Sequence, residues 1–195
     1  MRMVVASKNE GKIVEIRTIL KALDLHIVSQ AQAGIEIDVE EDGVTFEQNA
    51  VKKAQQIMKI CKCTTLADDS GLEVDYLNGA PGVYSARYAG VGATDEQRNQ
   101  KLLHALQDVP LERRTARFVC VIAVTFPNGE TKIVEGKCEG IVGFEPKGKN
   151  GFGYDPLFYV PKYHMTMAEM DNHIKNSISH RGQALRKLNQ MLKEY

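Results

Sequence analysis

Short apolar runs alternate with helix-spaced apolar stripes along the chain, and this alternation restricts the possible folds more than any other feature of the sequence. The first apolar run, 3–6, is typical of a buried strand. After a polar turn, Ile13, Ile16 and Leu20 recur at the spacing of one helix face. Strand and helix patterns interleave to the end of the chain, which predicts a single α/β domain over residues 1–195.

Capping and hairpin signals locate several further elements. Thr45 and Thr94 are each followed three residues later by glutamine, which is the capping-box pattern at a helix start. The runs 117–126 and 131–135 flank a Pro-Asn-Gly turn and predict a β-hairpin, which 136–142 extends. Because a hairpin is antiparallel, the sheet is expected to be mixed.

Four more segments have weaker signals. The sequence predicts a turn at 68–71 between two strands, because Asp-Asp-Ser-Gly follows a short apolar run. It also predicts a short helix near Ala168 and a terminal helix that begins near Ser179. The Gly- and Lys-rich segment 144–155 is too long for a simple connector, and long loops often carry function.

Composition excludes several classes of protein. With 195 residues, the chain is long enough to bury a core without disulfides or a structural metal. Twenty-five basic residues balance twenty-five acidic ones, so no net field draws the chain to nucleic acid or an anionic membrane, and neither partner is expected. The N-terminal apolar run is short and charged residues follow it, so we expect a cytoplasmic protein. The four cysteines form no C-x-x-C pair, and Cys120 is expected to be a buried thiol.

The polar turn before the first helix is a candidate phosphate site. Ser7, Asn9, Gly11 and Lys12 lie where backbone N–H groups and the helix dipole favour an anion. The segment is not a Walker A loop, because the G-x-x-x-x-G-K-[ST] pattern is absent. A simple helix cap, with Asn9 capping and Lys12 solvated, explains the same residues at least as well.

Acidic residues from two stretches could bind a divalent cation. Glu40, Glu41, Asp68 and Asp69 offer the oxygen ligands that Mg²⁺ prefers, and paired carboxylates repel unless a cation or a proton neutralises one. The alternative for Asp68 and Asp69 is an ordinary turn. Their neighbours at 36, 38 and 42 are expected to form a solvated acidic edge.

Three further groups could bind the rest of a nucleotide. Thr45, Asn49 and Lys53 recur every four residues on one helix face, although a solvated polar face explains that pattern better. The loop 151–156 places two aromatic residues among glycines, where a purine could stack or where the rings could simply anchor the loop. Near the last helix, three donor side chains could bind an anion or a base, or could be ordinary surface and cap residues. They are Lys175, His180 and Arg181.

Together these segments resemble the inosine triphosphate pyrophosphatase family, which hydrolyses non-standard purine triphosphates. The resemblance covers essentially the whole chain and rests on six ordered motifs. They are S-x-N-x-x-K at 7–12, G-x-T-F-x-x-N-A at 43–50, L-A-D-D-S-G-L at 66–72, G-A-P-G-V-Y-S-A-R-Y at 79–88, G-F-G-Y-D-P at 151–156 and S-H-R-G at 179–182.

The resemblance implies a role for each matching residue. Asp69 is implied to be the proton acceptor, and Mg²⁺ is implied to bind Glu40, Asp68 and Asp69. The implied substrate-binding residues are Ser7, Lys8, Asn9, Glu10, Gly11, Lys12, Asn49, Lys53, Ser70, Phe152, Gly153, Tyr154, Asp155, Lys175, His180 and Arg181. The implied fold is an elongated mixed sheet flanked by helices, in two lobes around an active-site cleft, and the implied assembly is a homodimer. Lys8 and Asp42 depart from the usual glycine and threonine, which puts phosphate and metal affinities in doubt.

The expected reaction is hydrolysis of ITP, dITP or XTP to the monophosphate and pyrophosphate, which would cleanse the nucleotide pool. One alternative is a sensor that binds a purine triphosphate without turnover. Another is a pyrophosphatase for other modified nucleotides. The paired carboxylates favour an enzyme, because a sensor has no need of acidic groups beside phosphates.

Overall fold

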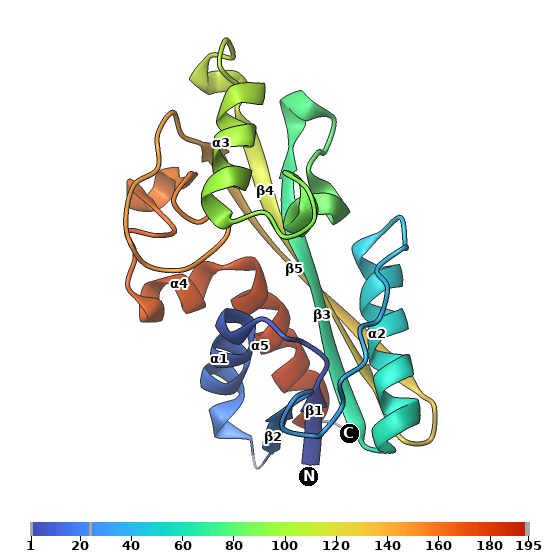
Figure 1. Cartoon of the computed structure of the whole chain (residues 1–195). Coiled ribbons are helices and arrows are strands. Elements are labelled where there is room, and N and C mark those ends of the chain that lie inside the picture. Colours follow the sequence, from blue (N-terminus) through green and yellow to red (C-terminus); the bar gives the residue numbers. More distant parts are fainter. Residues whose placement is uncertain (1, 24, 194–195) are drawn as a thin grey trace. The chain divides into compact units, whose positions relative to one another are not determined.

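The computed structural model describes residues 2–23 and 25–193, and it contains a seven-stranded sheet with helices packed against it (Figure 1). The strands lie in the order β2-β1-β3-β4-β5-β6-β7. β1 pairs in parallel with β2 and β3, whereas β6 pairs antiparallel with β5 and β7. The expected mixed sheet of an α/β protein is therefore confirmed.

For most segments, the observed strands and helices lie where the sequence predicts them. The strands are β1 Arg2–Val5, β2 His26–Ser29, β3 Thr64–Val74, β4 Thr115–Thr125, β5 Thr131–Val142, β6 Phe158–Val160 and β7 Met165–Thr166. The α-helices are α1 Glu10–Ile19, α2 Phe46–Cys61, α3 Asp95–Ala105, α4 Asn172–Ile178 and α5 His180–Lys193. Short 3-10 helices connect several of them.

The described residues divide into two compact units. The first unit holds residues 2–69, 120–136 and 180–193, and the second holds 70–119 and 137–179. Each unit has its own apolar core: α1, α5 and one face of β1, β3 and β4 pack together in the first, and α3 packs on strands of the second. The expectation of one domain, with two lobes around a cleft, stays a prediction.

Helix starts follow the capping chemistry that the sequence indicates. Asn9 Oδ1 accepts a hydrogen bond from Lys12 N, which confirms Asn9 as the cap of α1. Thr45 Oγ1 accepts from Gln48 N at the start of α2. At α3, Thr94 and Gln97 make the full reciprocal capping box.

Two local expectations are wrong. The segment 68–71 is no turn, because β3 runs without interruption from Thr64 to Val74 and its buried neighbours favour extended backbone over the local turn preference of Asp, Ser and Gly. Ala168 lies in a turn, and the next helix begins only at Asn172, where Asp171 accepts a cap hydrogen bond from Ile174 N. The hairpin turn at 127–129 is confirmed by the Phe126 N–H donating to Glu130 O.

Candidate active site

Two adjacent aspartates of the first unit face opposite sides of β3. Because successive side chains of a strand point to opposite faces, a continuous strand sends Asp68 toward α1 and α5 and Asp69 toward α2. Figure 1 shows α2 on the other side of β3 from α1 and α5. The correction of the predicted turn to a strand therefore gives the two carboxylates separate surroundings.

Asp68 is the centre of a buried ion network. Arg181 Nε donates to Asp68 Oδ2 at 2.8 Å, and Lys12 Nζ lies 2.5 Å from Asp68 Oδ1. The Cys120 thiol donates to Asp68 Oδ2 at 3.0 Å, and Glu15 Oε2 accepts from Arg181 Nη1 at 2.6 Å. Burial alone would raise the pKa of Asp68, but the charges of Arg181 and Lys12 outweigh it and hold that pKa well below its usual value. Asp68 is thus a buried anion with its oxygens already engaged.

Asp69 differs from Asp68 in its hydrogen bonding and in the direction of its pKa shift. Its Oδ2 is buried and has no hydrogen-bond partner among the residues that the structure describes. Its Oδ1 lies 3.6 Å from Lys53 Nζ. Burial raises the pKa of Asp69, and the positive charges of Lys53 and Lys12 offset this effect only in part. An unpaired acceptor with a raised pKa is what a proton acceptor or a cation ligand requires.

Lys53 joins Asp69 to the acidic segment before α2. Its ammonium donates to Glu41 Oε1 at 2.6 Å and to Asp68 O at 2.8 Å. Burial lowers the pKa of Lys53, but the carboxylates of Asp69 and Glu41 outweigh burial and leave that pKa raised. Within the acidic segment, Glu41 contacts the lysine, whereas Glu40 is exposed.

The buried face of α2 corrects one interpretation of the sequence. Asn49 is fully buried and Lys53 nearly so, and the solvated face expected for them is wrong. Asn49 Oδ1 accepts from Gly43 N at 2.8 Å. A Cβ at position 43 would lie 2.6 Å from that oxygen, so glycine allows the acidic segment to approach the helix. The motif G-x-T-F-x-x-N thereby fixes the position of the acidic segment.

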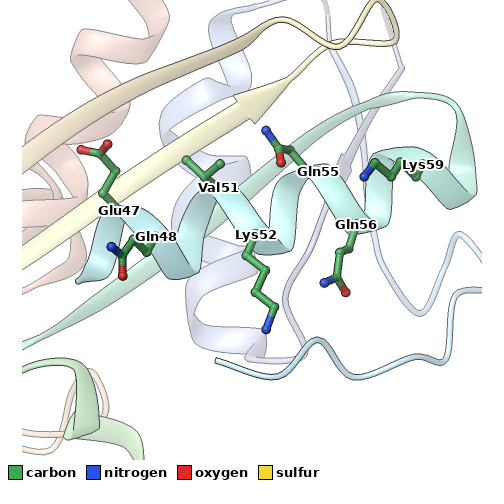
Figure 2. A pocket seen from close by; sticks show the side chains of 7 residues that line it. All are labelled: Glu47, Gln48, Val51, Lys52, Gln55, Gln56 and Lys59. Atoms are coloured by element: carbon green, nitrogen blue, oxygen red, sulfur yellow. The ribbon is translucent and has the colours of Figure 1, made fainter. Parts of the chain in front are cut away.

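The solvated face of α2 lies elsewhere on the same helix. Figure 2 shows the side chains that line a pocket there, and all of those labelled come from α2. Its lining residues are Glu47, Gln48, Val51, Lys52, Gln55, Gln56 and Lys59. None of the buried ion-network residues lines it, so we do not assign the candidate site to this pocket.

In the turn before α1 both lysines pair with carboxylates, and the expected anion site stays a prediction. Ser7 Oγ accepts from Asn9 N at 3.1 Å. Lys8 Nζ lies 2.7 Å from Asp38 Oδ1, and both side chains are exposed. Lys12 is paired with Asp68, so the expectation of a solvated Lys12 is wrong. Glu10 and Gly11 lie in the first turn of α1.

In the second unit, the loop 151–155 is fixed from several sides. Asp155 Oδ2 accepts from Phe152 N at 2.9 Å and from Lys175 Nζ at 2.7 Å. The Lys175 ammonium also lies 4.9 Å from the centre of the Phe152 ring, within the range of a cation–π contact. Tyr154 is buried and its hydroxyl donates to Ser85 O at 2.9 Å. A Cβ at Gly151 would lie 2.1 Å from Asp155 Oδ2, so this turn requires glycine.

The predicted residues therefore fall into separate groups. The first unit brings together Asp69, Lys53, Asn49 and Lys12, and it also contains His180 and Arg181, both buried. The second unit contains Ser70 on β3 and the loop 151–155 with Lys175. Arg181 donates to Asp68 and Glu15, which occupies its guanidinium. The sequence reasoning missed Glu15, although its position three residues after Lys12 on one helix was a usable signal.

The fold and these residues define an α/β protein in which a buried carboxylate lies beside an ammonium group and has one oxygen without a hydrogen-bond partner among the described residues. Comparisons with known proteins identify the family. The Ham1 family model matches residues 3–191. The chain belongs to the Ham1 family.

Named relatives and solved structures cover nearly the full chain. The dITP/XTP pyrophosphatases of Clostridium perfringens and Desulforamulus reducens are 52% and 53% identical, each over 98% of this chain and over 97% and 96% of their own lengths. The structure of a HAM1 protein from Coxiella burnetii is 46% identical, with a TM-score of 0.91 and complete coverage of both chains. The Staphylococcus aureus Ham1 protein is 44% identical, with a TM-score of 0.89, over 100% of this chain and 99% of its own.

Proposed function

We propose that this chain is a nucleoside triphosphate pyrophosphatase that hydrolyses deaminated purine triphosphates, dITP, ITP and XTP, to the monophosphate and pyrophosphate. Full-length relatives named dITP/XTP pyrophosphatase support the substrate class. One structural observation carries the chemistry: Asp69 Oδ2 is a buried acceptor without a hydrogen-bond partner among the described residues, and an ammonium lies beside the same carboxylate. A sensor would have no use for such a group.

Mg²⁺ is the proposed cofactor, and Asp69 and Glu41 fit it best. Among the residues described, no cluster of three or more His, Cys, Asp or Glu side chains could hold a metal ion. Mg²⁺ needs no such cage, because it usually keeps several waters and binds one or two carboxylates together with substrate phosphates. Asp69 and Glu41 both contact Lys53 and offer two carboxylates to one ion. Glu40 is exposed, and Asp68 is engaged by cations, so we propose that Asp68 supports Lys12 electrostatically.

The residues of the first unit have separate roles in the proposed reaction. When bound, Mg²⁺ would supply charge neutralisation for the phosphates and a more acidic water. Asp69 accepts the proton of the water that attacks the α-phosphorus, and its raised pKa makes it a stronger base than an exposed aspartate. Lys53 and Lys12 stabilise the charge that develops on the leaving pyrophosphate. The N-terminus of α1, with Ser7 to Lys12, binds the phosphates.

The loop of the second unit is the proposed base-binding element. The Phe152 ring offers a stacking surface, and Lys175 places an ammonium with three N–H donors beside it. A 6-oxo purine accepts a hydrogen bond where adenine presents an amino donor, so a donor at that position disfavours ATP. His180 and Ser70 keep their proposed roles as substrate contacts.

Pyrophosphate release from a substrate panel tests the proposal. ITP, dITP, XTP, GTP and ATP are assayed with Mg²⁺ and with EDTA. The proposal predicts that kcat/KM for the deaminated purines exceeds that for ATP by at least about tenfold, since each mismatched buried polar group costs on the order of 1–3 kcal/mol. Binding of ITP without turnover would favour a sensor, and activity confined to other modified nucleotides would favour the second alternative. Equal kcat/KM for ITP and ATP would contradict the selectivity.

Assembly and location complete the proposal. We propose a cytoplasmic homodimer with no nucleic-acid or membrane partner, on the basis of the family resemblance and the balanced charge. Within the described ranges, no helix is long and apolar enough to cross a membrane. Light scattering on the purified protein tests the dimer, because a monomeric mass at micromolar concentration would contradict it.

A further inference from the structure

We propose that Asp95 and Asn99, on α3, are positioning residues that set the base-binding loop by holding Gly153 from both sides. Asp95 Oδ2 accepts a hydrogen bond from Gly153 N at 2.7 Å, and Asn99 Nδ2 donates to Gly153 O at 3.0 Å. No motif of the sequence pointed to these two residues. The inference rests on the proposed function of the loop.

The spacing of the two side chains explains how one helix makes both contacts. Residues four apart in a helix lie on one face, so Asp95 and Asn99 meet the same loop residue. The Gly153 N–H belongs to the peptide group after Phe152, and the Gly153 C=O belongs to the peptide group before Tyr154. Both peptide groups that flank this glycine are therefore fixed by side chains of α3.

The fixed glycine determines where the aromatic neighbours point. Gly153 has a φ of +63°, in the left-handed region, and lies in a turn that the Asp155 N–H closes by donating to Phe152 O. Tyr154 is held separately through its hydroxyl on Ser85 O, and Phe152 N is held by Asp155. The Phe152 ring lies beside the Lys175 ammonium, 4.9 Å from its centre, and the peptide groups on either side of Gly153 fix the backbone from which this ring extends.

The supporting side chains are themselves held in place. Asn99 is buried, with 7% of its surface exposed. Asp95 pairs with Arg98, which also donates to Ala86 O and to Ala93 O. The Thr94–Gln97 capping box fixes the helix start one residue before Asp95. Because both contacts come from a capped helix, the loop has a defined position before any ligand binds, which lowers the entropy cost of binding.

Two small probes separate base binding from phosphate binding. Inosine monophosphate carries the base with little of the triphosphate, and inorganic tripolyphosphate carries the phosphates without a base. Calorimetric titration of each, with Mg²⁺ present, gives the dissociation constants for wild type, Asn99→Leu, Asn99→Asp, Asp95→Ala and Asp95→Asn. Gln100→Ala, an exposed neighbour on α3, is the matched control.

The expected result is a loss of base binding alone. Asn99→Leu and Asp95→Ala weaken inosine monophosphate binding about tenfold, because each removes one hydrogen bond from the loop. Asn99→Asp weakens it at least as much, since a carboxylate would face the Gly153 carbonyl. Asp95→Asn keeps an acceptor for Gly153 N–H and retains most of the affinity. Tripolyphosphate binds all variants as it binds wild type.

Kinetics give a second readout that a merely structural role would not change. The positioning variants should raise KM for ITP and lower the ratio of kcat/KM between ITP and ATP, with kcat nearly unchanged, because the base is remote from the reacting phosphorus. Unchanged inosine monophosphate binding in Asp95→Ala and Asn99→Leu would overturn the inference. Equal losses for both probes would overturn it as well. If titration of inosine monophosphate into wild type gives no more heat than titration into buffer alone, and wild type hydrolyses no ITP, the proposed function itself fails.

Discussion

Neutralising the two adjacent aspartates should have opposite consequences. Asp68→Asn removes a buried charge that Arg181 and Lys12 both contact, so it leaves the buried Arg181 and the half-buried Lys12 without their shared partner. Asp69→Asn removes a charge that burial already disfavours, as its raised pKa shows. We therefore expect Asp68→Asn to lower the free energy of unfolding. We expect Asp69→Asn to abolish turnover while the fold is retained.

The magnitudes follow from the surroundings of each carboxylate. Removing one partner of a buried ion pair costs about 3–5 kcal/mol, which corresponds to a fall in Tm of about 6–20 °C for a chain of this size. The pKa of Asp68 is lowered on folding, so its stabilisation is complete above about pH 4 and is lost as the pH falls through the folded pKa. The pKa of Asp69 is raised, so ionising it opposes folding as the pH rises through that pKa. At pH 7, Asp69→Asn should stay within about 1 kcal/mol of wild type or exceed it.

Urea denaturation followed by circular dichroism measures both effects, because the chain has no tryptophan for fluorescence. Pyrophosphate release from ITP is measured on the same preparations. At pH 7, the Asp68→Asn deficit should be fully present, and it should shrink below about pH 4 as the wild-type carboxylate takes up a proton. The reasoning is refuted if Asp69→Asn loses as much stability as Asp68→Asn, or if it retains near-normal turnover.

Three further predictions follow from single contacts. Lys53→Ala should lower kcat/KM for ITP by about 100-fold or more. Lys52 lies on the same helix and pairs with the exposed Asp42, so Lys52→Ala should stay within about twofold of wild type. Similar losses for both variants would contradict the role of Lys53. Gly136→Ala should destabilise the protein by about 1–3 kcal/mol in urea titrations, because its Cβ would lie 2.1 Å from a backbone oxygen of α5, and unchanged stability would contradict that packing. Cys138, whose pKa burial raises to about 11, should resist iodoacetamide at pH 8 while half-buried Cys61 is labelled, as peptide mass spectrometry would show; prompt labelling of native Cys138 would refute this.

The sequence predicted the layout of the fold because its local signals agree with its tertiary packing. Apolar periodicity and capping residues located α1, α2, α3 and α5, and the Pro-Asn-Gly turn located the hairpin. The exception at 68–71 arose because turn preference is a local property, whereas β3 continues through this segment in a sheet whose other strands are distant in the sequence. That single error hid the separation of Asp68 from Asp69.

The candidate site was predictable in its residue types and less so in its contacts. Motifs identified Asp69, Lys12 and Lys53, but sequence spacing could not show that Lys53 is buried or that Glu41 reaches it, because the acidic segment has no regular structure to fix its side-chain directions. The supporting residues Glu15 and Asn99 were missed because hydrogen bonds across 166 and 54 residues of chain leave no local pattern.

Hydrolysis of ITP in ¹⁸O-labelled water, with Mg²⁺ present, tests the central claim most directly. Attack on the α-phosphorus by a water that Asp69 deprotonates should place one ¹⁸O in inosine monophosphate, release unlabelled pyrophosphate and fail in Asp69→Asn. Labelled pyrophosphate, or inosine diphosphate with inorganic phosphate as the products, would contradict the account.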